Sequence, residues 1–164
     1  MPKHTLSVLV ENHAGVLSRV AGLFSRRGFN IDSLAVGVTE NPEISRMTIV
    51  VDGDEYIVEQ VSKQLNKLID VIKIKQLVSG DSVSRELALI KVNATASTRA
   101  EIMQIVEIFR AKIIDVSKNA LTIEISGNTD KVAALEEMLR QFGVKEIVRT
   151  GLIALERGNK NINV

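Results

Sequence analysis

One order of elements, strand–helix–strand–strand–helix–strand, is predicted twice along this chain of 164 residues. In the first half, residues 5–10 place apolar side chains at every second position, the period that indicates a strand. After Gly15, apolar residues recur at helical spacing, namely Leu17, Val20, Ala21 and Phe24. Three further strand-like segments and a second helical one complete this half: 34–38, 47–51, 58–68 and 72–74.

The second half repeats the same order of strand-like and helical segments: 87–92, 102–109, 114–116, 121–125, 132–142 and 144–155. Each half therefore predicts two helices on one face of a four-stranded antiparallel sheet. We expect an α+β protein of two tandem ferredoxin-like βαββαβ modules, at 1–78 and 85–158. A polar link at 79–84 joins them, and a polar tail at 159–164 is expected to be frayed.

Packing both helices on one face leaves the other face of each sheet uncovered. A module of this size is also only marginally stable alone, because small domains bury a smaller share of their surface. Packing of the two modules on each other, or dimerisation, would cover apolar area. We therefore expect an oligomer.

Composition excludes several kinds of site. Without cysteine the chain can form no disulfide, thiolate nucleophile, Cys-ligated zinc site or iron–sulfur cluster. Its two histidines, His4 and His13, cannot build a multi-histidine metal centre, and we expect no metal. A net charge of +1 argues against a broad nucleic-acid-binding surface. No apolar run approaches the roughly 20 residues that span a bilayer, and no signal-peptide pattern is present, so a cytoplasmic protein is expected.

Catalytic motifs are missing as well. The sequence has no phosphate-binding GxxxxGK[ST] loop, no HExxH and no nucleophile elbow. Carboxylates such as Asp32, Asp52 and Asp54 are better explained as helix caps and turn residues. The predicted strands also lack the exposed aromatic side chains on which an RNA-binding module of this fold stacks bases. We therefore expect no catalytic residues.

The segment from Glu11 to Ser18, between the first strand and the first helix, is the strongest candidate for a binding site. Backbone N–H groups at a helix start are unpaired and carry the positive end of the helix dipole, so they can hold a carboxylate. Gly15 permits close approach of a ligand, and Asn12 offers both a donor and an acceptor. The alternative is a structural role, in which Asn12 caps the helix and Gly15 is present only because the tight turn has no room for a side chain. His13 is then an ordinary histidine of a surface loop.

A second polar segment, 27–32, ends the first helix and starts the second strand. Asn30 in this segment tolerates an unusual turn conformation. In a side-by-side dimer it could instead face the first loop of the partner chain. Spacing alone does not choose between these two interpretations.

Five stretches of the chain resemble a known family. They are LSVLVENHAGVLSRV at 6–20, GLFSRRGFNIDSL at 22–34, SRMTI at 45–49, RELALIKV at 85–92 and IFRAKIIDV at 108–116. The first module is similar to an ACT domain, the amino-acid-sensing βαββαβ unit. The chain as a whole resembles the regulatory small subunits of acetohydroxyacid synthase, also called acetolactate synthase, over nearly its full length.

The resemblance implies a non-enzymatic subunit that pairs as a homodimer and binds a catalytic large subunit. That large subunit carries thiamine diphosphate, a divalent metal and FAD, and this chain carries no cofactor. The small subunit raises catalytic activity and confers feedback inhibition, typically by valine, in branched-chain amino-acid synthesis. The effector lies between two ACT domains, where the resemblance implies one group of residues from each chain: Asn12, Ala14, Gly15, Val16 and Leu17 from one, Asn30 and Ile31 from its partner.

Other functions remain to be weighed against this one. A stand-alone ACT-type sensor acting on another partner would share the first-loop segment, but it should lack the family-like stretch at 85–116. An enzyme on a ferredoxin-like fold would need converging titratable groups that this sequence does not offer. A purely structural dimerisation subunit is disfavoured by the intact set of Asn12, Gly15 and Asn30.

Overall fold

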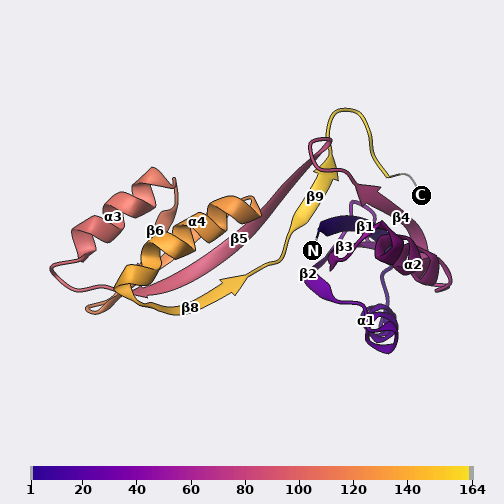
Figure 1. Ribbon diagram of the computed structural model, residues 1–164, viewed down its shortest axis with the longest axis horizontal. Helices are drawn as coiled ribbons and strands as arrows, with labels where there is room; N and C mark the ends of the chain where they lie inside the picture. Colours follow the sequence, from indigo (N-terminus) through magenta and orange to yellow (C-terminus); the bar gives the residue numbers. More distant parts are fainter. Residues whose placement is uncertain (1, 163–164) are drawn as a thin grey trace. The chain divides into compact units, whose positions relative to one another are not determined.

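In the computed structural model of the protein, which describes residues 2–162, the first alternating segment forms β1 and the Gly15 segment forms the helix after it (Figure 1). The elements of the first half are β1 (Lys3–Glu11), α1 (Val16–Arg27), β2 (Ile31–Val38), β3 (Ile44–Asp52), α2 (Glu55–Asn66) and β4 (Val71–Leu77). Their order is the one that the hydrophobic periodicity predicts.

The first sheet has the strand order β2-β3-β1-β4, and all of its neighbouring strands are antiparallel. Because β1 and β2 both pair antiparallel with β3, they run in the same direction. Glu11 at the end of β1 lies opposite Ile44, and Val38 at the end of β2 lies opposite Ser45. The C-terminal ends of β1 and β2 therefore lie at the same end of the sheet. β2 is an outer strand of this sheet.

The core of the first unit lies between this sheet and its two helices. Leu6 and Val8 of β1 are wholly buried, as are Val61 and Leu65 of α2. Phe24 of α1 joins the same cluster. These contacts follow from the sequence, because period two puts every second residue of β1 on one face and helical spacing gives each helix one apolar stripe.

The second unit repeats this architecture around a core of its own, with Ile90, Ile123 and Leu139 wholly buried. Its strands follow the order β6-β7-β5-β8, again antiparallel. In Figure 1, α3 and α4 lie on the same side of β5 and β8. The elements are β5 (Ser82–Asn93), α3 (Arg99–Ile108), β6 (Lys112–Val116), β7 (Ala120–Gly127), α4 (Thr129–Leu139), a short 3-10 turn at Arg140–Phe142 and β8 (Val144–Arg149). The α+β class with two tandem ferredoxin-like units is confirmed.

The C-terminal segment departs from expectation. The structure groups the described residues from Leu152 onward, including β9 (Ile153–Glu156), with the unit that ends at Val83, and leaves Ser84–Gly151 as the other unit. Ile162 is buried with Leu9 and Ile44, so the prediction of a frayed tail is wrong as far as Ile162. The physical reason is that the sheet face carrying Leu9 is apolar and gains by being covered. The last two residues, 163–164, lie outside the described part of the chain.

Two further boundaries differ from the predicted ranges. Residues 82–84, expected in the link, already belong to β5, and residues 152–158, expected in the second module, are grouped with the first unit. An ion pair of 2.9 Å between Lys75 of β4 and Glu156 of β9 helps to hold this returning segment.

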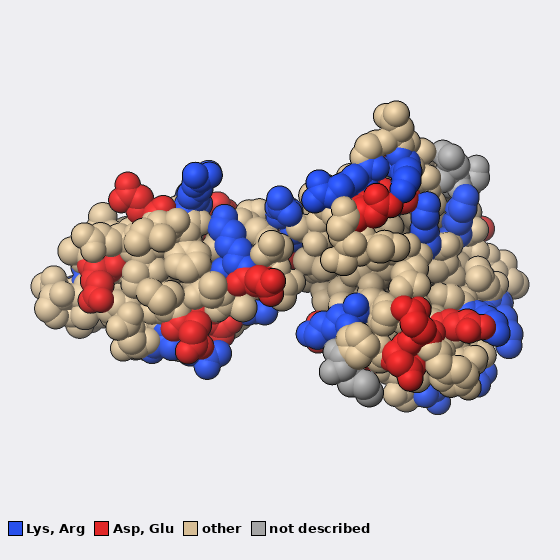
Figure 2. Space-filling model, turned by 45° about the horizontal axis from the view of Figure 1, so that its top comes forward, with Lys and Arg blue, Asp and Glu red and all other residues tan. Residues whose placement is uncertain are grey.

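In Figure 2 the acidic and basic side chains are interspersed with uncharged residues over the surface of each unit. This distribution agrees with the net charge of +1. Within residues 2–162, no helix combines the length and the apolar character needed to cross a membrane.

Candidate functional site

The loop between β1 and α1 is shaped by Gly15. Its φ of 89° and ψ of −13° lie in the left-handed region, which glycine adopts without steric cost. Gly15 occupies the N-cap position of α1, and no side chain caps the helix there. The Val16 N–H donates to the His13 carbonyl only at 3.5 Å, and the N–H groups that follow it in the first helical turn have no partner within the helix, so they lie with the positive end of the helix dipole at the loop.

Asn12 is fixed beside this helix start by the turn between β2 and β3. Its backbone N–H donates to the Glu43 carbonyl and its side-chain Nδ2 donates to the Pro42 carbonyl, each at 2.8 Å. Because the donor end of the amide is used in this way, Oδ1 is the end that remains to accept a hydrogen bond from a ligand.

The other predicted residues of this loop differ in exposure. Ala14 and Gly15 are exposed, and the Leu17 side chain is 47% exposed beside them. Val16, by contrast, is buried in the core of the first unit, so only its backbone is left to contact a ligand. The loop thus exposes the Leu17 side chain next to the backbone amides at the start of α1.

Asn30 and Ile31 lie at the opposite end of the same sheet. The Asn30 carbonyl accepts from the Asp52 amide, and Ile31 pairs with Val51, whereas the end of β1 lies opposite Ile44. About seven residues of strand, roughly 23 Å, separate these ends. One chain therefore does not bring the two predicted groups of residues together.

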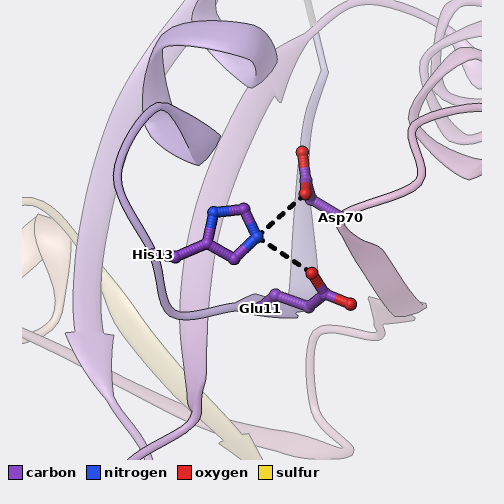
Figure 3. A group of neighbouring side chains, drawn as sticks. All are labelled: Glu11, His13 and Asp70. Carbon is purple, nitrogen blue, oxygen red and sulfur yellow. Dashed lines mark hydrogen bonds and ion pairs between the residues drawn. The ribbon is translucent and has the colours of Figure 1, made fainter.

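The structure also contains a cluster of charged side chains at this loop that the sequence analysis did not predict (Figure 3). Glu11 ends β1, His13 lies in the loop and Asp70 immediately precedes β4. His13 Nε2 lies 2.9 Å from Glu11 Oε2 and 3.1 Å from Asp70 Oδ1. Arg19 of α1 donates through Nε to the other oxygen of Asp70, Oδ2. The Glu11-x-His13 spacing was visible in the sequence, but nothing in it pointed to Asp70.

The electrostatics of this cluster follow from these contacts. The Glu11 carboxylate hydrogen-bonded to His13 raises the pKa of the imidazole above its ordinary value, with help from the Ala14 carbonyl and from Asp70. The Arg19 guanidinium holds the pKa of Asp70 below its ordinary value. At neutral pH Asp70 is therefore an anion fixed between the first helix and the first loop.

We expect Glu11→Gln to lower the pKa of His13, because the amide removes the main group that favours the imidazolium. A pH titration of the His13 ring protons by NMR, in EDTA to exclude metals, measures this change. Since the folded-state pKa is raised above 6.5, the stabilisation from this contact is complete below pH 6.5 and is lost as pH rises through the folded-state value. A titration midpoint unchanged by Glu11→Gln would show that the contact does not form in solution.

Two family models match the chain in sequence order. An ACT domain model of the acetohydroxyacid synthase small-subunit type matches residues 6–73. A model for the small subunit of acetolactate synthase matches residues 85–158. The first match contains the whole loop at 11–17 and the Asn30 segment, and the second contains nearly all of the other unit.

Individual relatives match over almost the full length. A probable acetolactate synthase small subunit of Archaeoglobus fulgidus is 58% identical over 158 residues, covering 96% of this chain and 99% of that protein. The acetolactate synthase small subunit of Mycobacterium leprae is 57% identical over 162 residues, covering 99% and 96% respectively. The crystal structure of the small subunit from Thermotoga maritima superposes with a TM-score of 0.90 at 47% identity, covering 98% of this chain and all of that one.

Proposed function

Because the chain belongs to the acetolactate synthase small-subunit family, we propose that it activates a catalytic large subunit and makes that subunit sensitive to feedback inhibition by valine. Thiamine diphosphate, its divalent metal and FAD belong to the large subunit, and this chain contributes regulation with no active site of its own. The observation that carries the proposal is the match of both units, in order, to models of this one family.

The first loop has the chemistry to bind a free amino acid. The uncapped start of α1 supplies N–H donors and a positive dipole for the carboxylate. Asn12 Oδ1 would accept from the ammonium, and exposed Leu17 would offer apolar surface to an isopropyl group. Such a site distinguishes one methylene by only about 1–3 kcal/mol, so leucine and isoleucine should bind as weaker effectors.

A homodimer would bring Asn30 and Ile31 to this loop. β2 is an outer strand, with Val36 and Val38 exposed on it. If β2 pairs antiparallel with β2 of a partner chain across a twofold axis, the start of one strand lies beside the end of the other. β1 and β2 end at the same end of the sheet. Asn30, just before β2 of one chain, would therefore lie near Asn12, just after β1 of the other chain.

Regulation follows from a site shared between two chains. An amino acid that contacts both chains binds the paired arrangement more tightly than any other, and so stabilises that arrangement. A coupling of about 1–3 kcal/mol, typical of allosteric proteins, suffices to change activity severalfold. We infer that the valine-bound arrangement holds the catalytic subunit in its less active state.

Calorimetric titration with L-valine, with D-valine as the control, tests the proposal. We expect stereoselective binding of about one valine per chain, because a twofold dimer repeats each site. The same titration is repeated with the catalytic subunit present, and activity is assayed with and without this chain. Absence of activation, together with absence of stereoselective binding in both titrations, would contradict the proposed function.

A further inference from the structure

The cluster at the end of β1 joins three potential metal ligands from separate segments of the first unit. Ligand atoms of Glu11, His13 and Asp70 all lie within 4.8 Å of one another. Figure 3 shows that one imidazole nitrogen, Nε2, faces the carboxylates of both acidic residues. Its distances to them, 2.9 and 3.1 Å, are those of hydrogen bonds, and the ligand atoms would move apart by only a few tenths of an ångström to hold one ion at about 2.0–2.2 Å from each.

Two contacts outside this trio orient its ligand atoms. His13 Nδ1 lies 3.2 Å from the Ala14 carbonyl, which can only accept, so Nδ1 carries a hydrogen. Nε2 is then the nitrogen that faces the two carboxylates, where it donates its own hydrogen to Glu11 when no ion is present, and a bound ion would take the place of that hydrogen. Arg19 holds Oδ2 of Asp70 and thereby directs Oδ1 toward His13. Metal-ligating imidazoles and carboxylates are held by outer hydrogen bonds of this kind.

We propose that Glu11, His13 and Asp70 form a binding site for a divalent transition-metal ion of the zinc class. One imidazole and two carboxylates are ligands that Zn²⁺ accepts, with water in a fourth position. An imidazole ligand favours such ions over Mg²⁺, which prefers oxygen alone. With the imidazole neutral, as a metal ligand must be, the two carboxylates outweigh the single Arg19 guanidinium and the site attracts a dication. The inference departs from the expectation of no metal and does not depend on the proposed function.

Binding at this position would restrain the first loop. Glu11 and His13 are the residues on either side of Asn12, and Asp70 is anchored at the head of β4, where its carbonyl accepts from the Glu11 amide at 2.9 Å. An ion shared by the three side chains would therefore tie both neighbours of Asn12 to the sheet. The ion makes the geometry of the loop less variable without occupying the amides of α1.

Calorimetric titration of the untagged, metal-free full chain with ZnCl₂, and separately with MgCl₂, tests the site. We expect about one Zn²⁺ per chain and far weaker binding of Mg²⁺. His13→Gln should weaken Zn²⁺ binding by about tenfold or more, because a ligand is lost. His4→Gln is the matched control, since it removes the other histidine of the chain and should leave Zn²⁺ affinity unchanged.

Two results would overturn the proposal: no Zn²⁺ binding by the folded wild-type chain, or equal Zn²⁺ affinity in wild type and His13→Gln. His13 lies on an exposed loop, so its variant should retain the wild-type circular dichroism spectrum. Glu11→Gln provides a second ligand variant, with the same loss expected. Co²⁺ absorption bands that appear in wild type and disappear in both variants would support the assignment. No amino acid or catalytic subunit is present, so failure here is distinct from failure of the proposed regulation.

Discussion

Gly15→Asp is expected to abolish inhibition by valine while leaving activation of the catalytic subunit intact. The new carboxylate would lie where the ligand carboxylate binds, and like charges brought together cost several kcal/mol. Valine affinity should therefore fall by about a hundredfold or more. The aspartate Cβ would also come 3.0 Å from Nη1 of Arg19, at the flexible end of a side chain that can move aside. Activity of the reconstituted enzyme against valine concentration measures the effect.

Gly80→Asp separates the effect of charge at the loop from that of backbone strain. Gly80 has the same φ of 89°, and a Cβ there meets no neighbour within 4 Å. Both variants therefore pay the cost of a non-glycine residue in the left-handed region, about 1–2 kcal/mol. We expect Gly80→Asp to keep normal valine inhibition. If Gly15→Asp lost activation as well, unfolding of the first unit would explain the result and the effector site would lose its support.

The fold was predictable from the sequence because its information is local and periodic. Leu6, Val8 and Val10 recur at period two in the sequence, although the whole stretch from Leu6 to Val10 is buried in the structure. The apolar stripes on α1 and α2 recur at helical spacing, so the type and order of these elements follow from residues close in sequence. Gly15 was identifiable for the same reason, since a strand, a short loop and a helix meet around it.

The charged cluster was not predictable, because it depends on strand register. Asp70 reaches His13 only because β4 pairs with β1 so that Val71 lies opposite Val10, with a register shift next to it. Periodicity predicts that a strand exists, but a shift of one residue would send Asp70 elsewhere. The packing of the C-terminal segment on Leu9 was not predicted for a related reason, because nothing near Leu9 in the sequence indicates that Ile162 packs against it.

Leu139→Ala is expected to destabilise the Ser84–Gly151 unit by about 2–5 kcal/mol, the usual cost of truncating a buried leucine. Leu139 is wholly buried at the end of α4, in a core with no member in common with the other unit's core. Valine affinity should not change, because every proposed effector residue lies in the first unit. Hydrogen exchange by mass spectrometry measures the lost protection in β7, and calorimetry measures the affinity.

Leu65→Ala is the matched reverse experiment. Leu65 is also wholly buried, and it follows Val58 and Val61 on α2 at the same spacing at which Leu139 follows Val132 and Leu135 on α4. Its truncation should lower protection in β3, leave β7 protected and weaken valine binding. A typical domain has only about 5–15 kcal/mol of stability, so either loss is large enough to detect. Equal loss of protection in both strands from either variant would mean that the two cores unfold as one cooperative unit. Damage to the second unit would then reach the effector loop through global stability, and regulation could not be assigned to the first unit alone.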